Sequence, residues 1–194
     1  MRRYLTTALL CEGREDERFL SALIERQVRE FSLLDPGFES GAVELQSCRT
    51  TWAAERIDGA VLEAAAAFDI VFVHNDYNER GKIDALRTRL ADTLPQQTRL
   101  IAVVPIRETE AWLLADPDAL PRGGSRDASP TNPRDVESIP DPKKPLAAAL
   151  GRPLDAASAD YIGENISLER LARVPAYQSF MHDLTKALKE LNFL

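Results

Sequence analysis

Acidic side chains follow three of the apolar segments that the sequence predicts to be β-strands. Glu12 follows the first segment, with Asp16 four residues later. Asp76 follows a second such segment, and Glu108 and Glu110 follow a third. Two carboxylates about 4 Å apart repel each other by about 4 kcal/mol at an effective dielectric constant near 20, so a positive charge must lie between them. Oxygen ligands without sets of cysteine or histidine select Mg²⁺ or Mn²⁺, and these residues therefore predict a divalent-metal site that also takes a phosphate-bearing substrate.

Apolar and amphipathic segments alternate along the first part of the chain. Continuous apolar runs are typical of parallel strands covered on both faces, whereas apolar residues that repeat every three or four positions indicate helices. The predicted strands are 3–10, 42–47, 70–73 and 100–104, and the predicted helices are about 15–31, 51–67, 82–94 and 108–115. This alternation predicts an α/β fold with an open, mostly parallel four-stranded sheet flanked by helices. Because ligands bind outside the carboxyl ends of such strands, the acidic residues are expected to meet at one edge of the sheet.

Three regions are expected along the chain. Residues 1–115 form the α/β core. Residues 116–145 are predicted to be a loop or lid, because their prolines and glycines leave little room for regular structure. Residues 146–194 show helical periodicity and are expected to pack on the core.

The overall composition restricts the classes of function. With 44% hydrophobic and 28% charged residues, the 194-residue chain is typical of a globular protein. The net charge of −7 argues against a broad basic face for nucleic acid, although metal ions can join phosphates to carboxylates. No apolar run approaches the roughly 18 residues of a membrane span, and no secretory signal is recognisable, so a cytoplasmic protein without membrane contact is expected.

Ordinary structural roles compete with the metal assignment. Acidic residues in the first turn of a helix interact favourably with the helix dipole, which is the role expected for Glu15 and Glu17 and an open alternative for Asp16. Asp76 could cap the turn after its strand, and Asn78 could adopt a left-handed backbone conformation. Metal binding is nevertheless the preferred interpretation of Asp76.

Four residues near the later strands have competing interpretations of their own. His74 could be a base or a ligand, but a histidine that ends a buried strand is expected to be hydrogen-bonded to the backbone. Glu108 and Glu110 are two positions apart, so at most one of them is expected to point into the site. Trp112 is expected in the core and not at a surface where bases stack.

Two motifs resemble the signature of the Toprim domain, which occurs in type IA and type II topoisomerases, bacterial primases, small RNA-maturation nucleases and OLD-type nucleases. Glu12-Gly13 after a strand, followed by Asp16, corresponds to the glutamate of that signature, and Asp76-Tyr77-Asn78 corresponds to its Asp-x-Asp element. Longer segments resemble a small family of Toprim-like bacterial proteins that are often encoded beside ABC- or SMC-type ATPases in defence-like gene neighbourhoods. These segments are PIRETEAWLLAD (105–116), DPKKPL (141–146) and VPAYQSFMHDL (174–184).

The resemblance implies a Rossmann-like Toprim fold and a role for each matching residue. Glu12 would serve as general acid/base or metal ligand, Asp76 would bind metal, and Asp16 would add a second acidic contact. Asn78 stands where the family pattern has a second aspartate, and its amide oxygen can ligate but carries no charge. This replacement leaves three alternatives: metal affinity is weaker, Glu108 and Glu110 supply the missing charge, or the site has lost catalysis.

The resulting functional expectation is a divalent-metal-dependent nuclease that cleaves DNA or RNA. Two metal ions can activate water and stabilise the leaving oxygen, and a lysine near the scissile phosphate would stabilise developing charge. Lys143 and Lys144 are the candidates for that lysine. The sequence has no Gly-x-x-x-x-Gly-Lys-Ser/Thr loop, so any ATP hydrolysis would belong to an ATPase partner. The alternatives are a non-catalytic binding or regulatory subunit of an ATPase complex and a phosphatase or phosphotransferase for a small phosphorylated substrate.

Overall fold

The computed structural model describes residues 3–11, 13–34, 37–45, 54–76, 79–124 and 132–194. Its centre is a sheet of four parallel strands in the order β2-β1-β3-β4. The strands are β1 (Arg3–Leu10), β2 (Phe38–Leu45), β3 (Ile70–His74) and β4 (Arg99–Val103). The predicted α/β fold with a four-stranded sheet flanked by helices is confirmed, and it is Rossmann-like in arrangement.

The chain changes direction across the sheet between β1 and β3. It moves outward from β1 to the edge strand β2 and then returns past β1 to pair β3 with the other side of β1. In open parallel sheets, the crevice at such a switch point is where ligands bind. The residues that follow β1 and β3 therefore occupy the favoured position for a functional site.

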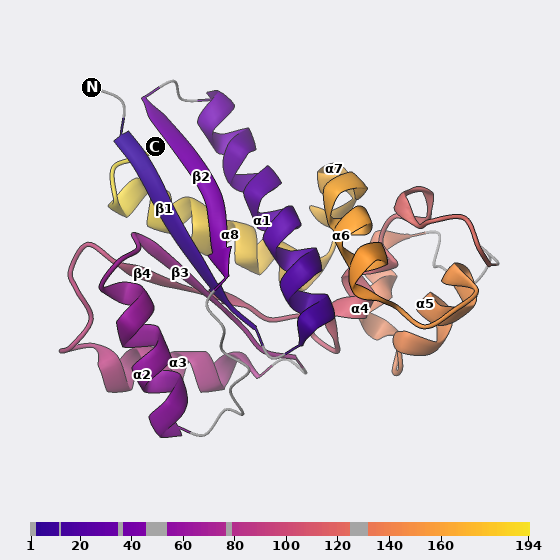
Figure 1. The fold of residues 1–194 in the computed structure, drawn as a ribbon, viewed down its shortest axis with the longest axis horizontal. Helices are drawn as coiled ribbons and strands as arrows, with labels where there is room; N and C mark the ends of the chain where they lie inside the picture. The colour runs from indigo at the N-terminus through magenta and orange to yellow at the C-terminus, as the bar shows by residue number, and fades with distance from the viewer. Residues whose placement is uncertain (1–2, 12, 35–36, 46–53, 77–78, 125–131) are drawn as a thin grey trace.

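Helices cover both faces of the sheet (Figure 1). One face packs against α1 (Arg14–Leu34) and α8 (Pro175–Glu190), and the other packs against α2 (Ala54–Ala65) and α3 (Arg80–Leu90). Successive strand residues alternate between these layers: Phe72 belongs to the α1 and α8 side, whereas Val71 and Val73 belong to the α2 and α3 side. This two-sided burial explains why β3 has no polar residue before His74.

The second strand begins earlier than the sequence pattern indicated. It was expected over 42–47 but starts at Phe38, whose ring is buried and meets Phe193 edge-on at 5.4 Å between ring centroids. The polar residues between Phe38 and Val43 obscure this start, because the outermost strand is half exposed. Residues 46–47 lie outside the described part of the chain.

A group of short helices lies beside the amino end of α1, beyond the carboxyl ends of the strands (Figure 1). Its members are α4 (Thr109–Leu113), η1 (Pro117–Ala119), η3 (Pro133–Ser138), α5 (Lys143–Leu150), α6 (Ala156–Asn165) and α7 (Leu168–Leu171). Helix α6 packs closely on α1, where a Cβ on Gly163 would lie 2.6 Å from the backbone oxygen of Phe19. Helix α8 packs against β4, so the C-terminal helices form part of the fold around the sheet.

Residues 116–145, predicted to be a loop or lid with little regular structure, contain short helices in their described part. Two 3₁₀ helices form there, and Ala119, Leu120 and Val136 are buried. The prolines that seemed to exclude regular structure instead begin it: Pro117 and Pro133 occupy the first turn after the capping residues Asp116 and Asn132. Proline suits that position because its missing N–H would have no helical partner there. Helix α5 likewise begins at Lys143, three residues before the predicted boundary at 146.

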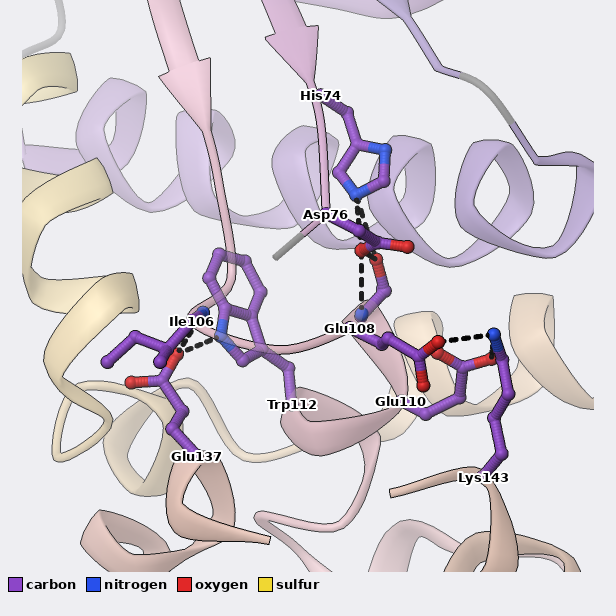
Figure 2. Close-up of polar contacts among 9 residues, drawn as sticks. His74, Asp76, Ile106, Glu108, Glu110, Trp112, Glu137 and Lys143 are labelled. Atoms are coloured by element: carbon purple, nitrogen blue, oxygen red, sulfur yellow. Dashed lines mark hydrogen bonds and ion pairs between the residues drawn. The ribbon is translucent and has the colours of Figure 1, made fainter. Parts of the chain in front are cut away.

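A buried carboxylate ties this group of helices to the sheet. Glu137 Oε1 accepts hydrogen bonds from Trp112 Nε1 at 3.0 Å and from the backbone N–H of Ile106 at 3.3 Å (Figure 2). Its other oxygen, Oε2, accepts one from the backbone N–H of Ala176 at 3.0 Å. Trp112 is fully buried, as predicted. Within the described part of the chain, none of the helices combines the length and apolar character needed to cross a bilayer.

Candidate metal centre

Three side chains converge at the switch point of the sheet. Asp16 lies in the first turn of α1, His74 is the last residue of β3, and Asp76 follows two residues later. One potential ligand atom from each lies within 4.8 Å of the others. Ligand distances of about 2.1 Å place opposite donors about 4.2 Å apart, so a single ion suits this spacing after a small adjustment.

Thr109 holds the cluster together from the first turn of α4. Its hydroxyl Oγ1 lies 2.9 Å from His74 Nε2, and its backbone N–H donates to Asp76 Oδ1 at 3.1 Å. His74 Nε2 also lies 3.3 Å from Asp76 Oδ1. Such outer contacts fix the orientation of the groups that would bind a metal ion.

The carboxyl of Asp16 is held in an environment that disfavours its negative charge. Burial raises its pKa, and the neighbouring Asp76 carboxylate acts in the same direction. His74, a hydrogen bond from Thr109 and Lys143 act against this rise. A divalent cation between the two carboxylates would remove the repulsion, so the donor set fits a bound cation. Asp16, Asp76 and His74 are the residues that would hold it.

A second acidic pair faces the lysine of α5. Glu108 is 7% exposed and pairs with Lys143, with 2.6 Å between Oε1 and Nζ, while Glu110 Oε1 lies 3.8 Å from the same nitrogen (Figure 2). Burial raises the pKa of Glu110 to about 7, and the Asp16 and Glu108 carboxylates add to the rise against the influence of Lys143. Glu110 is therefore a carboxyl that exchanges its proton near neutral pH.

A cavity of about 420 Å³ joins these groups. Its polar lining comes from Gly13, Glu15, Asp16, Asp76, Glu110 and Lys143. Its apolar lining comes from Leu146, Ala147, Pro153 and Leu154. Glu110, within α4, lines the cavity, whereas Glu108, which caps that helix, does not, in agreement with the expectation that at most one would point into the site.

The remaining predicted site residues lie elsewhere or outside the described residues. Glu12 and Asn78 belong to the latter group, so their metal and catalytic roles stay predictions. Lys144, the second lysine candidate, is 84% exposed, pairs with Asp141 at 2.8 Å and does not line the cavity. Lys143 does line it, through its position at the start of α5.

The sequence did not predict the roles of two residues in the cluster. His74 was expected to be bonded to the backbone, but its Nε2 contacts two side-chain oxygens of the cluster. Thr109 was given no role of its own, although it lies between the two glutamates of the distinctive 105–116 segment and begins α4, the helix after β4. That position at the sheet edge was the available signal for Thr109.

The fold and the site define an α/β protein with a candidate cation site at the switch point of a parallel sheet. The chain belongs to the family described as Domain of unknown function (DUF4276), whose family model matches residues 11–185. Comparison with curated proteins and with solved structures found no significant match.

Proposed function

We propose that this protein is a divalent-metal-dependent nuclease of the Toprim type, which hydrolyses phosphodiester bonds of DNA or RNA. The observation that carries the proposal is the convergence of Asp16, His74 and Asp76 within 4.8 Å at the switch point of the sheet. The resemblance of the residues after β1 and β3 to the Toprim signature supports the same assignment. Glu12 and Asn78, which are close in sequence to Asp16 and Asp76, remain proposed ligands of the metal ion.

Mg²⁺ or Mn²⁺ at this site would polarise the phosphate and lower the pKa of a bound water. An imidazole beside two carboxylates favours the softer Mn²⁺ over Mg²⁺. Thr109 would keep His74 and Asp76 oriented toward the ion through the two contacts that it already makes.

The opposite wall of the cavity supplies charge and proton exchange. The Lys143 side chain is 58% exposed, so its ammonium group can turn from Glu108 toward a phosphate in the cavity. The Glu110 carboxyl, with a pKa of about 7, can accept or release a proton at neutral pH. In hydrolysis, a P–O bond forms to water as the bond to the leaving oxygen breaks, and the water loses one proton while the leaving group gains one.

We further propose that activity is controlled by a separate ATPase of the ABC or SMC type. This part of the proposal is supported by the family resemblance and by the lack of a phosphate-binding Gly-x-x-x-x-Gly-Lys-Ser/Thr loop in the sequence. Co-expression with an ABC- or SMC-type ATPase, followed by co-purification, would test it.

The nuclease proposal is tested with labelled linear DNA and RNA oligonucleotides in Mn²⁺, Mg²⁺ or EDTA. Cleavage should require the metal and fall at least about 100-fold in Asp16→Asn and in Asp76→Asn, because each variant removes an anionic ligand. Asp84→Asn is the matched control, because Asp84 is 56% exposed on α3 and pairs with Arg87 at the surface. Undiminished cleavage in both site variants, or in EDTA, would refute the assignment.

A non-catalytic regulatory subunit is the second candidate. The observation that favours it is the close Glu108–Lys143 ion pair, which already neutralises the lysine of the cavity. Stable co-purification with an ATPase, together with no detectable binding of Mn²⁺ by calorimetry, would select this function over the nuclease.

A further inference from the structure

The cavity beside the candidate metal centre has two chemically different ends. Carboxylates and Lys143 form one end, and side chains of α5 and the segment after it form the other. A volume of about 420 Å³ falls within the range of about 300–1,000 Å³ for small-molecule sites. One phosphate group and a cation occupy only the polar end, which leaves the apolar end for another part of the same ligand.

The apolar end is built on a fixed support. Leu146 is 1% exposed and belongs to the core, while Ala147 and Leu154 are half-buried at the cavity wall. Helix α5 ends at Gly151, which has a left-handed φ of 70°. Gly124 lies against the end of this helix, so closely that a Cβ there would be 2.0 Å from the backbone oxygen of Ala148. Because this wall is already ordered, little conformational entropy is lost when a flat apolar group packs on it.

The charges around the cavity limit how many phosphates can enter. Among the described lining residues, Lys143 is the single cationic side chain, and Glu15, Asp16, Asp76 and Glu110 are acidic. Duplex DNA carries one negative charge per about 1.7 Å of its axis, and each contacted phosphate needs a positive partner. One cation with Lys143 can neutralise one phosphate, whereas neighbouring phosphates would meet carboxylates.

We propose that this cavity binds a single nucleotide unit, with its phosphate between Lys143 and a cation held by Asp16 and Asp76, and with its base against Ala147 and Leu154. The inference rests on the proposed phosphodiesterase function and specifies its substrate class. The unit can come from the end of a single strand or from a free small nucleotide, because both present one phosphate and one base. Internal positions of a duplex do not present them in this way, since the base would first have to leave the stack.

Binding measurements on the whole chain in Mn²⁺ test the substrate class without relying on turnover. Calorimetric titration should give at least about 10-fold tighter binding of dAMP than of 2-deoxyribose 5-phosphate, because the base adds buried apolar area. Ala147→Trp should fill the apolar end and abolish this difference while Mn²⁺ binding persists. Ala148→Trp is the matched control on the same helix, because Ala148 is exposed and does not line the cavity.

The outcomes separate this inference from the proposed function. Equal binding of the two ligands, or a preference that survives Ala147→Trp, overturns the nucleotide site while intact Mn²⁺ binding leaves the metal centre standing. Failure of the wild-type chain to bind Mn²⁺ would instead overturn the proposed function itself.

Two polymer substrates identify the source of the nucleotide unit. Stepwise release of mononucleotides from a linear single strand, with a single-stranded circle left intact, is expected if strand ends enter the cavity. Cleavage of a free dinucleotide while linear strands and circles stay intact would support the same site with a small nucleotide as its substrate. If the circle is cleaved as fast as the linear strand, the proposal that a single nucleotide unit enters the cavity is overturned.

Discussion

The carboxylate of Asp16 folds back over Gly13, three residues earlier in the chain. A Cβ at position 13 would lie 2.3 Å from Asp16 Oδ2, a separation that no real side chain tolerates. The glycine at the corner between β1 and α1 therefore leaves the space in which this candidate ligand lies. The nearest atoms to the missing Cβ all belong to the Asp16 side chain, so an added methyl group would displace that side chain and not the backbone.

Gly13→Ala is expected to weaken Mn²⁺ binding by roughly 10-fold or more while leaving the free energy of unfolding within about 1 kcal/mol of the wild type. The methyl group pushes the carboxylate away from Asp76 and His74, but the helix can accept alanine. Calorimetry with Mn²⁺ and urea denaturation measure the two effects. Gly81→Ala on α3 is the control, because a Cβ there meets nothing within 4 Å. Unchanged metal affinity in Gly13→Ala would contradict the ligand role of Asp16.

Glu110 gives the metal-free protein a pH-dependent stability. Its pKa is about 7 in the folded state against an ordinary value of 4.5, so the folded state binds its proton more tightly than the unfolded state does. The contribution to stability is complete below about pH 4.5 and is lost as the pH rises through 7. Glu110→Gln should therefore match the wild type at pH 4 and exceed it at pH 8 by on the order of 2 kcal/mol. Urea denaturation in EDTA at several pH values measures this, and a difference that is constant with pH would be inconsistent with the expected titration.

Glu137 should prove to be a structural residue with a large effect on folding. It is 4% exposed and accepts hydrogen bonds from Trp112, Ile106 and Ala176. Glu137→Ala leaves these donors buried without an acceptor and is expected to cost roughly 3 kcal/mol or more. Glu137→Gln keeps one carbonyl oxygen and should lose less than half as much. Thermal and urea unfolding give both values, and equal losses would show that the fold requires both carboxylate oxygens or their charge, and that the side-chain volume and one remaining acceptor contribute little.

The sequence was sufficient for the fold because the apolar runs of β3 and β4 have no competing interpretation. The sequence also predicted that Asp16, Asp76 and Glu110 lie at one edge of the sheet, because the carboxyl ends of parallel strands share that edge. It was insufficient for residues 116–145, where prolines that begin 3₁₀ helices cannot be distinguished by composition from prolines that break structure. The different surroundings of Lys143 and Lys144 could not be predicted either. Adjacent residues of a helix point in directions about 100° apart, but the sequence did not show that a helix begins at Lys143.

Thr109→Val is expected to separate the orienting role of the threonine hydroxyl from its place in the fold. Valine has nearly the same shape, so the buried helix α4 keeps its packing and the backbone N–H still donates to Asp76. The lost hydroxyl releases His74 and removes a hydrogen bond that lowers the pKa of Asp16, so protons compete better with the metal. Mn²⁺ affinity should fall by about 10-fold to 100-fold, and the loss should be larger at pH 6 than at pH 8. Thr109→Ser restores the hydroxyl and should restore most of the affinity. An equal loss of affinity in the valine and serine variants would assign the effect to packing and leave the hydroxyl without a role at the metal centre.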